Sequence, residues 1–213
     1  MVNLDYLSTV LLGALFLSSL TTASPVVVKK HSKHVSLHRN TKSLSATEKP
    51  KKGTWEATVL SRTNYHRRQH GAPPLTWNTT IQAFAQSWVN RCVFRHSRTL
   101  LYGENLYVAG QSNTYPKPNG TAPVDNWYNE VQWYNWDEPG NLVGPQGQEI
   151  GHFTALVWAS SSQVGCAKAN CRKGTIWPNY YAQLVSCNYH VPGNVYGPDG
   201  DTSYFEENVL ERR

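Results

Sequence analysis

Apolar residues recur at helical spacing in two segments that follow residue 53. Thr54 can cap a first helix, which Gly71 and the next two prolines end. Asn78 can cap a second helix, whose apolar stripe places Cys92 on the buried face of the last turn. The apolar positions are Trp55, Val59 and Leu60 in the first helix and Ile81, Phe84, Ala85, Trp88, Val89 and Cys92 in the second.

The second half of the chain changes from helical spacing to alternation. The pattern predicts a third helix over 123–134 and a short fourth helix over 151–158, separated by a loop rich in Gly, Pro and Asn over 135–148. Strict alternation over 180–189 predicts a strand, and 163–168 is a second short candidate. Helices come first and strands later, without regular βαβ alternation, so the pattern predicts an α+β fold.

The first 23 residues have the features of a secretory signal peptide. An apolar run from Val10 to Leu20 precedes small residues that end at Ala23 and suit cleavage before Ser24. The run is shorter than the roughly 20 residues that a membrane-spanning helix needs. We therefore expect a secreted, extracellular protein.

The net charge of +6 belongs to a short segment and not to the rest of the chain. Residues 24–53 hold eight basic residues and one acidic residue, whereas residues 54–213 hold twelve of each. The segment has few apolar residues to bury, so we expect a disordered basic leader. It is predicted either to contact a cell wall or another polyanion, or to be a spacer or pro-segment. The near-neutral remainder gives no reason to expect nucleic acid as a partner, and we expect a monomer.

Four cysteines and two glycosylation sequons gain meaning from the expected secretion. An even number of cysteines in an oxidising compartment predicts two disulfides, which can pair in three ways. The absence of a CxxC pair argues against zinc ligation by these thiols. The cysteines are Cys92, Cys166, Cys171 and Cys187, and the expected glycosylation sites are Asn78 and Asn119.

Two long segments carry recognisable signatures. Residues 151–158 read GHFTALVW, and residues 181–194 contain CNY followed by a Gly-Asn pair. They resemble the two signatures of the CAP family (cysteine-rich secretory, antigen 5 and pathogenesis-related 1 proteins), with Ala155 where the family usually has Gln. Shorter matches follow in family order at 68–78, 96–97, 102–105 and 127–130.

The resemblance implies a CAP domain over 54–196, followed by a C-terminal extension over 197–213. The implied fold is a three-layer α–β–α sandwich, in which a small antiparallel sheet lies between helices. The family pattern also implies that Cys92 pairs with Cys171 and that Cys166 pairs with Cys187.

The resemblance also places four ionisable residues in a central cavity: His96, Glu104, Glu130 and His152. Two imidazoles and two carboxylates can bind a divalent cation such as Zn²⁺ or Mg²⁺, shuttle protons, or form a structural hydrogen-bond network. The sequence shows no nucleophile beside them and no HExxH motif. We therefore expect a protein that is not an enzyme and needs no cofactor, with a metal-dependent hydrolase as the last alternative.

An aromatic cluster suggests a ligand. Tyr128, Trp133 and Trp136 match a loose pattern that is associated with sterol binding in some family members. Aromatic residues near one helix are also typical of core packing. The first expectation is a binder of sterols, fatty acids or related small lipids. The alternative is an extracellular defence or virulence protein that acts without a lipid ligand.

Overall fold

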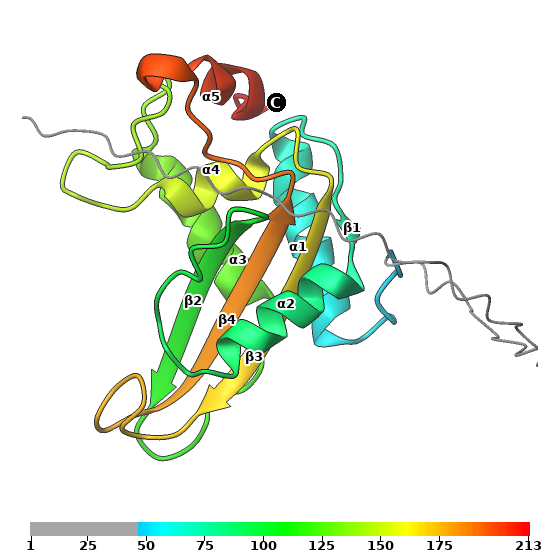
Figure 1. Ribbon diagram of the computed structural model, residues 1–213, viewed down its shortest axis with the longest axis vertical. Coiled ribbons are helices and arrows are strands. Elements are labelled where there is room, and N and C mark those ends of the chain that lie inside the picture. The colour runs from blue at the N-terminus through cyan, green and yellow to red at the C-terminus, as the bar shows by residue number, and fades with distance from the viewer. Residues whose placement is uncertain (1–46) are drawn as a thin grey trace, which may run out of the picture. The chain divides into compact units, whose positions relative to one another are not determined.

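A four-stranded sheet forms the centre of the fold (Figure 1). The structure is a computed structural model, and it describes residues 47–213. The predicted signal peptide (1–23) and residues 24–46 of the predicted leader lie outside the described residues. The strands, in the spatial order β1-β3-β4-β2, are β1 (Thr76–Trp77), β3 (Gln163–Cys171), β4 (Tyr181–His190) and β2 (Gly103–Gln111).

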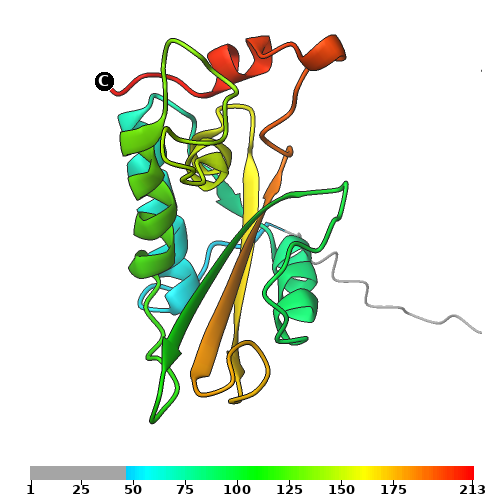
Figure 2. The same ribbon diagram turned by 90° about the vertical axis from the view of Figure 1, so that its left-hand side faces the viewer.

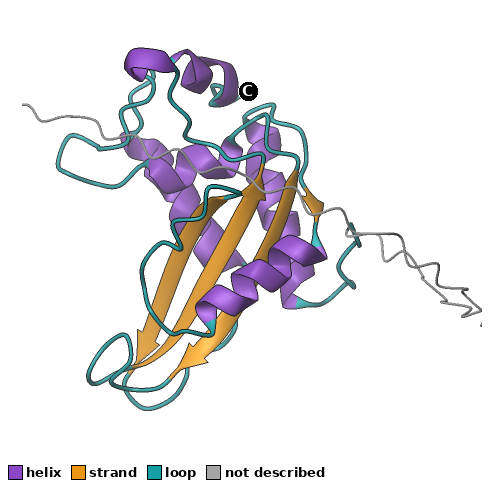
Figure 3. Cartoon of the chain, viewed as in Figure 1, coloured by secondary structure: helices purple, strands orange, loops and turns teal. Residues whose placement is uncertain are grey.

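Helices cover both faces of this sheet. Helix α2 packs on β3 and β4, whereas α1, α3 and α4 contact one another and the other face (Figure 2). Pairing is antiparallel except for the short parallel contact of β1 with β3. The predicted three-layer α–β–α sandwich is therefore confirmed (Figure 3). The helices are α1 (Trp55–Gln69), α2 (Thr79–Val89), α3 (Thr121–Tyr128), the 3-10 helix η1 (Asn129–Trp133), α4 (Gly151–Val157), the 3-10 helix η2 (Pro198–Gly200) and α5 (Ser203–Asn208).

Both predicted N-caps are present. The Thr54 hydroxyl accepts a hydrogen bond from the backbone N–H of Ala57, and the Asn78 side chain accepts from the N–H groups of Thr80 and Ile81. These bonds satisfy amides that have no partner within the helix.

Among the described residues, no helix is long and apolar enough to cross a bilayer.

Three details differ from the sequence-based expectation. Helix α2 ends at Val89, so Cys92 lies beyond its last turn, with a positive φ of 53° that a helix does not allow. The predicted third helix is an α-helix only to Tyr128 and continues as a 3-10 helix. Strand β2 was not predicted, because its sequence has several polar residues and two glycines.

The two disulfides join Cys92 to Cys171 and Cys166 to Cys187, as the family pattern implied. The first ties the segment after α2 to the end of β3. The second joins residues that lie directly opposite each other on β3 and β4. Helices cover both faces of the sheet at β4, so both alternating sets of its side chains are buried.

The predicted C-terminal extension packs against the rest of the described chain. Phe205 and Val209 join a core cluster with Phe153 and Trp158. The backbone N–H of Arg213 donates to a carbonyl at the end of α1. Residues 197–213 therefore contribute to the fold and cover one side of α4.

Arg67 is the most unusual core residue, because its side chain is fully buried in a helix face that is otherwise expected to be apolar. Its guanidinium donates to the carbonyl oxygens of Leu156 (3.0 Å), Trp158 (2.8 Å) and Ser161 (2.9 Å). Its Nε donates to Pro73 O at 2.8 Å. Burial lowers the pKa of Arg67 to about 10, against an opposing effect of Tyr189, so the side chain is a cation at neutral pH.

We predict that Arg67→Ala lowers the free energy of unfolding by at least about 3 kcal/mol, because several buried carbonyl groups lose their donor. Urea denaturation followed by circular dichroism measures this change. Arg68→Ala is the matched control, since Arg68 is exposed on the same helix, and it should change stability by less than about 0.5 kcal/mol. Equal effects of the two substitutions would contradict the assignment.

Candidate functional site

A cleft of about 260 Å³ lies where β2 begins and α4 begins. Three of the four predicted cavity residues line it, namely His96, Glu104 and His152. Glu130 does not line the cleft, but its carboxylate is hydrogen-bonded to the Nδ1 atom of His152. The structure therefore brings the four residues together as two histidine–glutamate pairs.

The first pair combines an exposed imidazole with a buried carboxylate. His96 Nδ1 lies 2.9 Å from Glu104 Oε1, and the two side chains are 59% and 5% exposed. The same carboxylate accepts hydrogen bonds from the backbone N–H of Ser97 and from the side-chain amide of Asn188. Glu104, on β2, thus holds the loop that carries His96.

These contacts shift both pKa values of the pair. Burial alone would raise the pKa of Glu104, but the hydrogen bonds from His96, Ser97 and Asn188 outweigh it and lower the pKa. The hydrogen bond to Glu104 raises the pKa of His96, against the effect of burial, and the charge of Glu149 adds to the rise. Both shifts favour the ion pair.

The second pair fixes the start of α4. His152 Nδ1 lies 2.6 Å from Glu130 Oε1, and Glu130 Oε2 accepts from the backbone N–H groups of His152 and Phe153. Helix α4 has no side-chain cap from its own N-cap residue, Ile150. Glu130 therefore caps the helix from η1 and orients the His152 ring at the same time.

The donor set fits a divalent cation only in part. In each histidine the Nδ1 atom is bonded to a carboxylate, which leaves Nε2 as the available ligand atom and reproduces the carboxylate–histidine pairs of zinc sites. In this arrangement the glutamates orient the rings and do not bind the ion themselves. Within residues 47–213, no three His, Cys, Asp or Glu side chains are grouped to hold a metal ion. An ion bound by the Nε2 atoms of His96 and His152 would need further ligands besides these two side chains.

Three of the cleft residues that were not among the predicted site residues have polar side chains. The Asn194 amide donates to Gly151 O at 2.8 Å, and its carbonyl accepts from the Thr154 hydroxyl. Asn105 Nδ2 donates to the carbonyl of His152 at 2.9 Å. Glu149 Oε2 lies 3.8 Å from His152 Nδ1. Asn105 and Asn194 lie within the matched signature segments, which was the available signal, whereas the loop residue Glu149 had none.

The predicted lipid-contact aromatics do not line this cleft. Trp136 stacks on His70 and meets Phe153 edge to face, and Tyr128 stacks on His66 at 3.8 Å between ring centroids. Tyr128, Trp133 and Trp136 are partly buried, and all three pack against the core cluster around Phe153. Their surfaces are largely occupied by the protein's own side chains.

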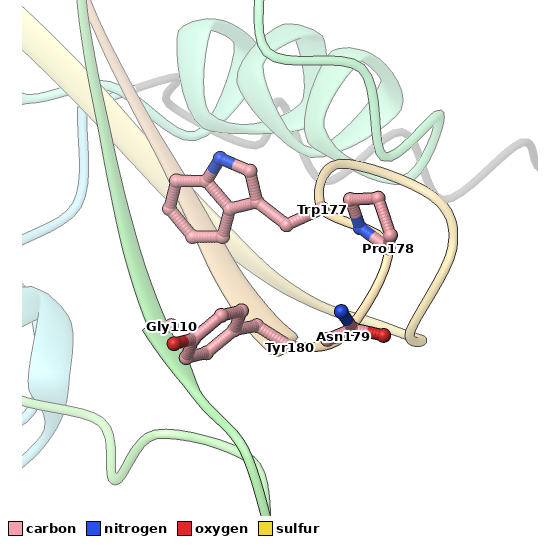
Figure 4. Close-up of a pocket in the computed structure, with 5 residues that line it drawn as sticks. All are labelled: Gly110, Trp177, Pro178, Asn179 and Tyr180. Carbon is pink, nitrogen blue, oxygen red and sulfur yellow. The ribbon is translucent and has the colours of Figure 1, made fainter.

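A second pocket, of about 330 Å³, lies near the other end of β2. Figure 4 shows the rings of Trp177 and Tyr180 on two sides of it, with Pro178 and Asn179 completing the wall from the loop between β3 and β4. A Cβ on Gly110 would lie 2.6 Å from the Trp177 ring, so only glycine lets the indole pack this closely on the strand.

An α–β–α sandwich with two disulfides and paired His and Glu side chains in a cleft is the arrangement that the CAP resemblance implied. Residues 60–189 match the family described as "CAP: Cysteine-rich secretory protein family", and the chain belongs to this family.

Relatives of this chain include plant and fungal proteins. The chain is 36% identical over 146 residues to pathogenesis-related protein 1A1 of Solanum lycopersicum, covering 65% of this chain and 74% of that protein. It is 36% identical over 160 residues to Repressed by EFG1 protein 1 of Candida albicans, covering 71% of this chain and 52%, about half, of that protein.

Solved structures show the same fold. BmVAL-1 aligns with a TM-score of 0.52 at 19% identity, covering 75% of this chain and 82% of that one. A crystal structure of NaASP2 with Zn²⁺ aligns with a TM-score of 0.52 at 19% identity, covering 73% and 84%.

We predict that His96 titrates above 6.5 and that Glu104→Gln lowers its midpoint, because the largest cause of the raised pKa is then lost. NMR titration of the imidazole signals measures this. The raised pKa of His96 contributes stability that is lost as pH rises through that pKa. The lowered pKa of Glu104 contributes stability that is lost as pH falls through its own pKa. The contribution is therefore largest between about pH 4.5 and 6.5.

Glu149→Gln is the matched control, since Glu149 adds the smallest contribution to the rise. It should lower the His96 midpoint less than Glu104→Gln does. A larger effect of the control would show that the hydrogen-bonded pair is not the main cause.

The two sequons differ in access. Asn78 is 8% exposed, and its Nδ2 donates to the Gln163 side chain at 2.9 Å. Asn119 is exposed, and its Oδ1 accepts from the N–H groups of Thr121 and Ala122, which leaves Nδ2 to the solvent. The geometry favours a glycan at Asn119.

We predict that protein secreted by a eukaryotic host carries its glycan on Asn119 in preference to Asn78, because a glycan on Asn78 would break the contact with Gln163. Mass spectrometry of glycopeptides measures the occupancy at each site. Asn119→Gln should remove most of the glycan mass, and Asn78→Gln should remove little. The reverse result would contradict the prediction.

Proposed function

We propose that this protein is secreted and binds a small hydrophobic lipid, such as a sterol or a fatty acid, in the extracellular space. The signal-like segment at the N-terminus, the two disulfides and the family membership support secretion. The observation that carries the lipid proposal is the aromatic pocket beside Gly110.

Three properties make this pocket suitable for a lipid. Its volume of about 330 Å³ falls within the range of small-molecule sites. The rings of Trp177 and Tyr180 meet at 76°, with 6.3 Å between centroids, so two apolar surfaces face one ligand. The Asn179 side chain offers a polar group to a hydroxyl or carboxyl group at one end of the molecule.

The pocket replaces the predicted aromatic cluster as the proposed ligand site. A ligand that used Trp133 or Trp136 would have to displace packed side chains, because both belong to the border of a core cluster. Tyr180 is 48% exposed and needs no such displacement. We therefore keep the lipid ligand that was expected from the sequence, and we propose the pocket beside Gly110 as its site in place of the cluster around Trp133 and Trp136.

For the cleft we propose ion binding through His96 and His152, with no turnover. The carboxylate contact at each Nδ1 supports this role, because it presets the ring that would bind the ion. A bound cation would join the loop before β2 to α4. The metal-dependent hydrolase remains the last alternative.

We predict that Gly110→Ala weakens binding of a fluorescent sterol, dehydroergosterol, by at least about tenfold, because the new Cβ displaces the Trp177 ring. Tyr180→Ala should have a similar effect. Energy transfer from tryptophan to the sterol measures the affinity, and cis-parinaric acid tests fatty acids in the same way. Circular dichroism checks that each variant is folded.

Tyr204→Ala is the control, since Tyr204 is exposed to a similar degree (43%) and lies far along the chain on α5. It should leave the affinity unchanged. Loss of binding in folded Trp133→Ala or Trp136→Ala, with normal binding in Gly110→Ala, would return the site to the first aromatic cluster. No binding of either probe by the wild-type protein would favour an interaction protein without a lipid ligand. Hydrolysis that requires added Zn²⁺ and is lost in a His96→Ala/His152→Ala variant would favour the hydrolase.

A further inference from the structure

The loop that joins α2 to β2 exposes apolar side chains to an unusual degree. Leu100 is 96% exposed and Leu101 is 67% exposed, the highest values among the large apolar residues of the described chain. Val93 and Phe94, earlier in the same loop, are also exposed. The loop stands out from the sheet beyond α2 in Figure 2. Two adjacent leucines that face water are unfavourable, and covering them with another apolar phase lowers the free energy.

The same loop concentrates positive charge. Arg91, Arg95 and Arg98 are all exposed, and none of them forms an ion pair with another described residue. No Asp or Glu occurs between Arg91 and Gly103. The next acid, Glu104, is buried against His96 and does not neutralise the surface of the loop. Because residues 54–213 hold equal numbers of acidic and basic residues, this is a local excess.

The loop is held in this shape at both ends. The disulfide from Cys92 to Cys171 fixes its start, and Glu104 binds both the His96 side chain and the N–H of Ser97. Between these points, the Thr99 hydroxyl accepts from the N–H of Leu101 at 3.1 Å. The two leucines therefore lie on a turn that these bonds hold, and their side chains face the solvent.

We propose that this loop docks the protein on an anionic phospholipid membrane. Arginines beside exposed leucines match the two parts of such a surface, since the guanidinium groups bind lipid phosphates and the leucines enter the acyl region. A soluble polyanion would neutralise the arginines but would leave Leu100 and Leu101 in water. Charge and apolar exposure together thus select a membrane over a polysaccharide.

The test is co-sedimentation of the full mature chain with vesicles of phosphatidylcholine alone and of phosphatidylcholine with a quarter phosphatidylserine. We expect binding to the anionic vesicles only. Leu100→Ser/Leu101→Ser and Arg95→Gln/Arg98→Gln should each weaken it by at least about tenfold. Raising the salt concentration should release the protein, because the phosphate contacts are screened.

Two matched controls lie outside the loop. Val143→Ser removes an apolar side chain that is 59% exposed, and Arg68→Gln removes an exposed arginine on α1. Both variants should bind vesicles as the wild type does. Unchanged vesicle binding in the folded leucine variant would overturn the proposal. So would heparin binding that depends on the arginines, if anionic vesicles are not bound.

The inference does not depend on the proposed lipid ligand, because the vesicles contain no sterol or free fatty acid. Vesicle binding by Gly110→Ala, which should lose dehydroergosterol, separates the two proposals. Loss of vesicle binding with normal sterol binding would be a failure of the docking loop alone.

Discussion

The buried guanidinium of Arg67 satisfies backbone carbonyls at the end of the short helix α4. Its donors reach the carbonyls of Leu156 and Trp158, which have no partner within a helix of seven residues. A cation is also favoured at this end by the helix dipole. Glu130 satisfies the amides at the opposite end. A helix this short is not stable alone, so side chains from α1 and η1 hold it in place, and His152 with it.

The two glutamates of the site therefore do the same structural work in different places. Glu104 joins His96 to the amide of Ser97, and Glu130 joins His152 to the first amides of α4. Each carboxylate fixes a backbone segment and a ring at once. The cleft is preset by bonds that exist without any ligand, which explains how a tetrad of catalytic appearance can serve a structural or ion-binding role.

Features that depend on neighbouring residues could be predicted from the sequence, whereas features that depend on distant parts of the chain could not. The caps at Thr54 and Asn78 follow from side-chain chemistry with nearby amides, and the disulfide pairing followed from the family pattern. The four cavity residues were predicted from the same family resemblance. The strand over 103–111 and the burial of Arg67 depend on partners far along the chain, β4 and the segment around residue 158. An arginine in a helix predicts an exposed position, and only the assembled fold reverses that.

The disulfide between Cys92 and Cys171 connects the features proposed to meet lipid. Cys92 begins the exposed loop with Leu100, and Cys171 ends β3 immediately before the loop that carries Trp177. The far end of the exposed loop is held by Glu104 at the cleft. One covalently anchored segment thus extends from the aromatic pocket to the histidine pair. A membrane docked at Leu100 and Leu101 would lie beside the start of β2, whereas the pocket at Gly110 lies near the end of that strand, so the disulfide is the covalent connection between the two proposed sites.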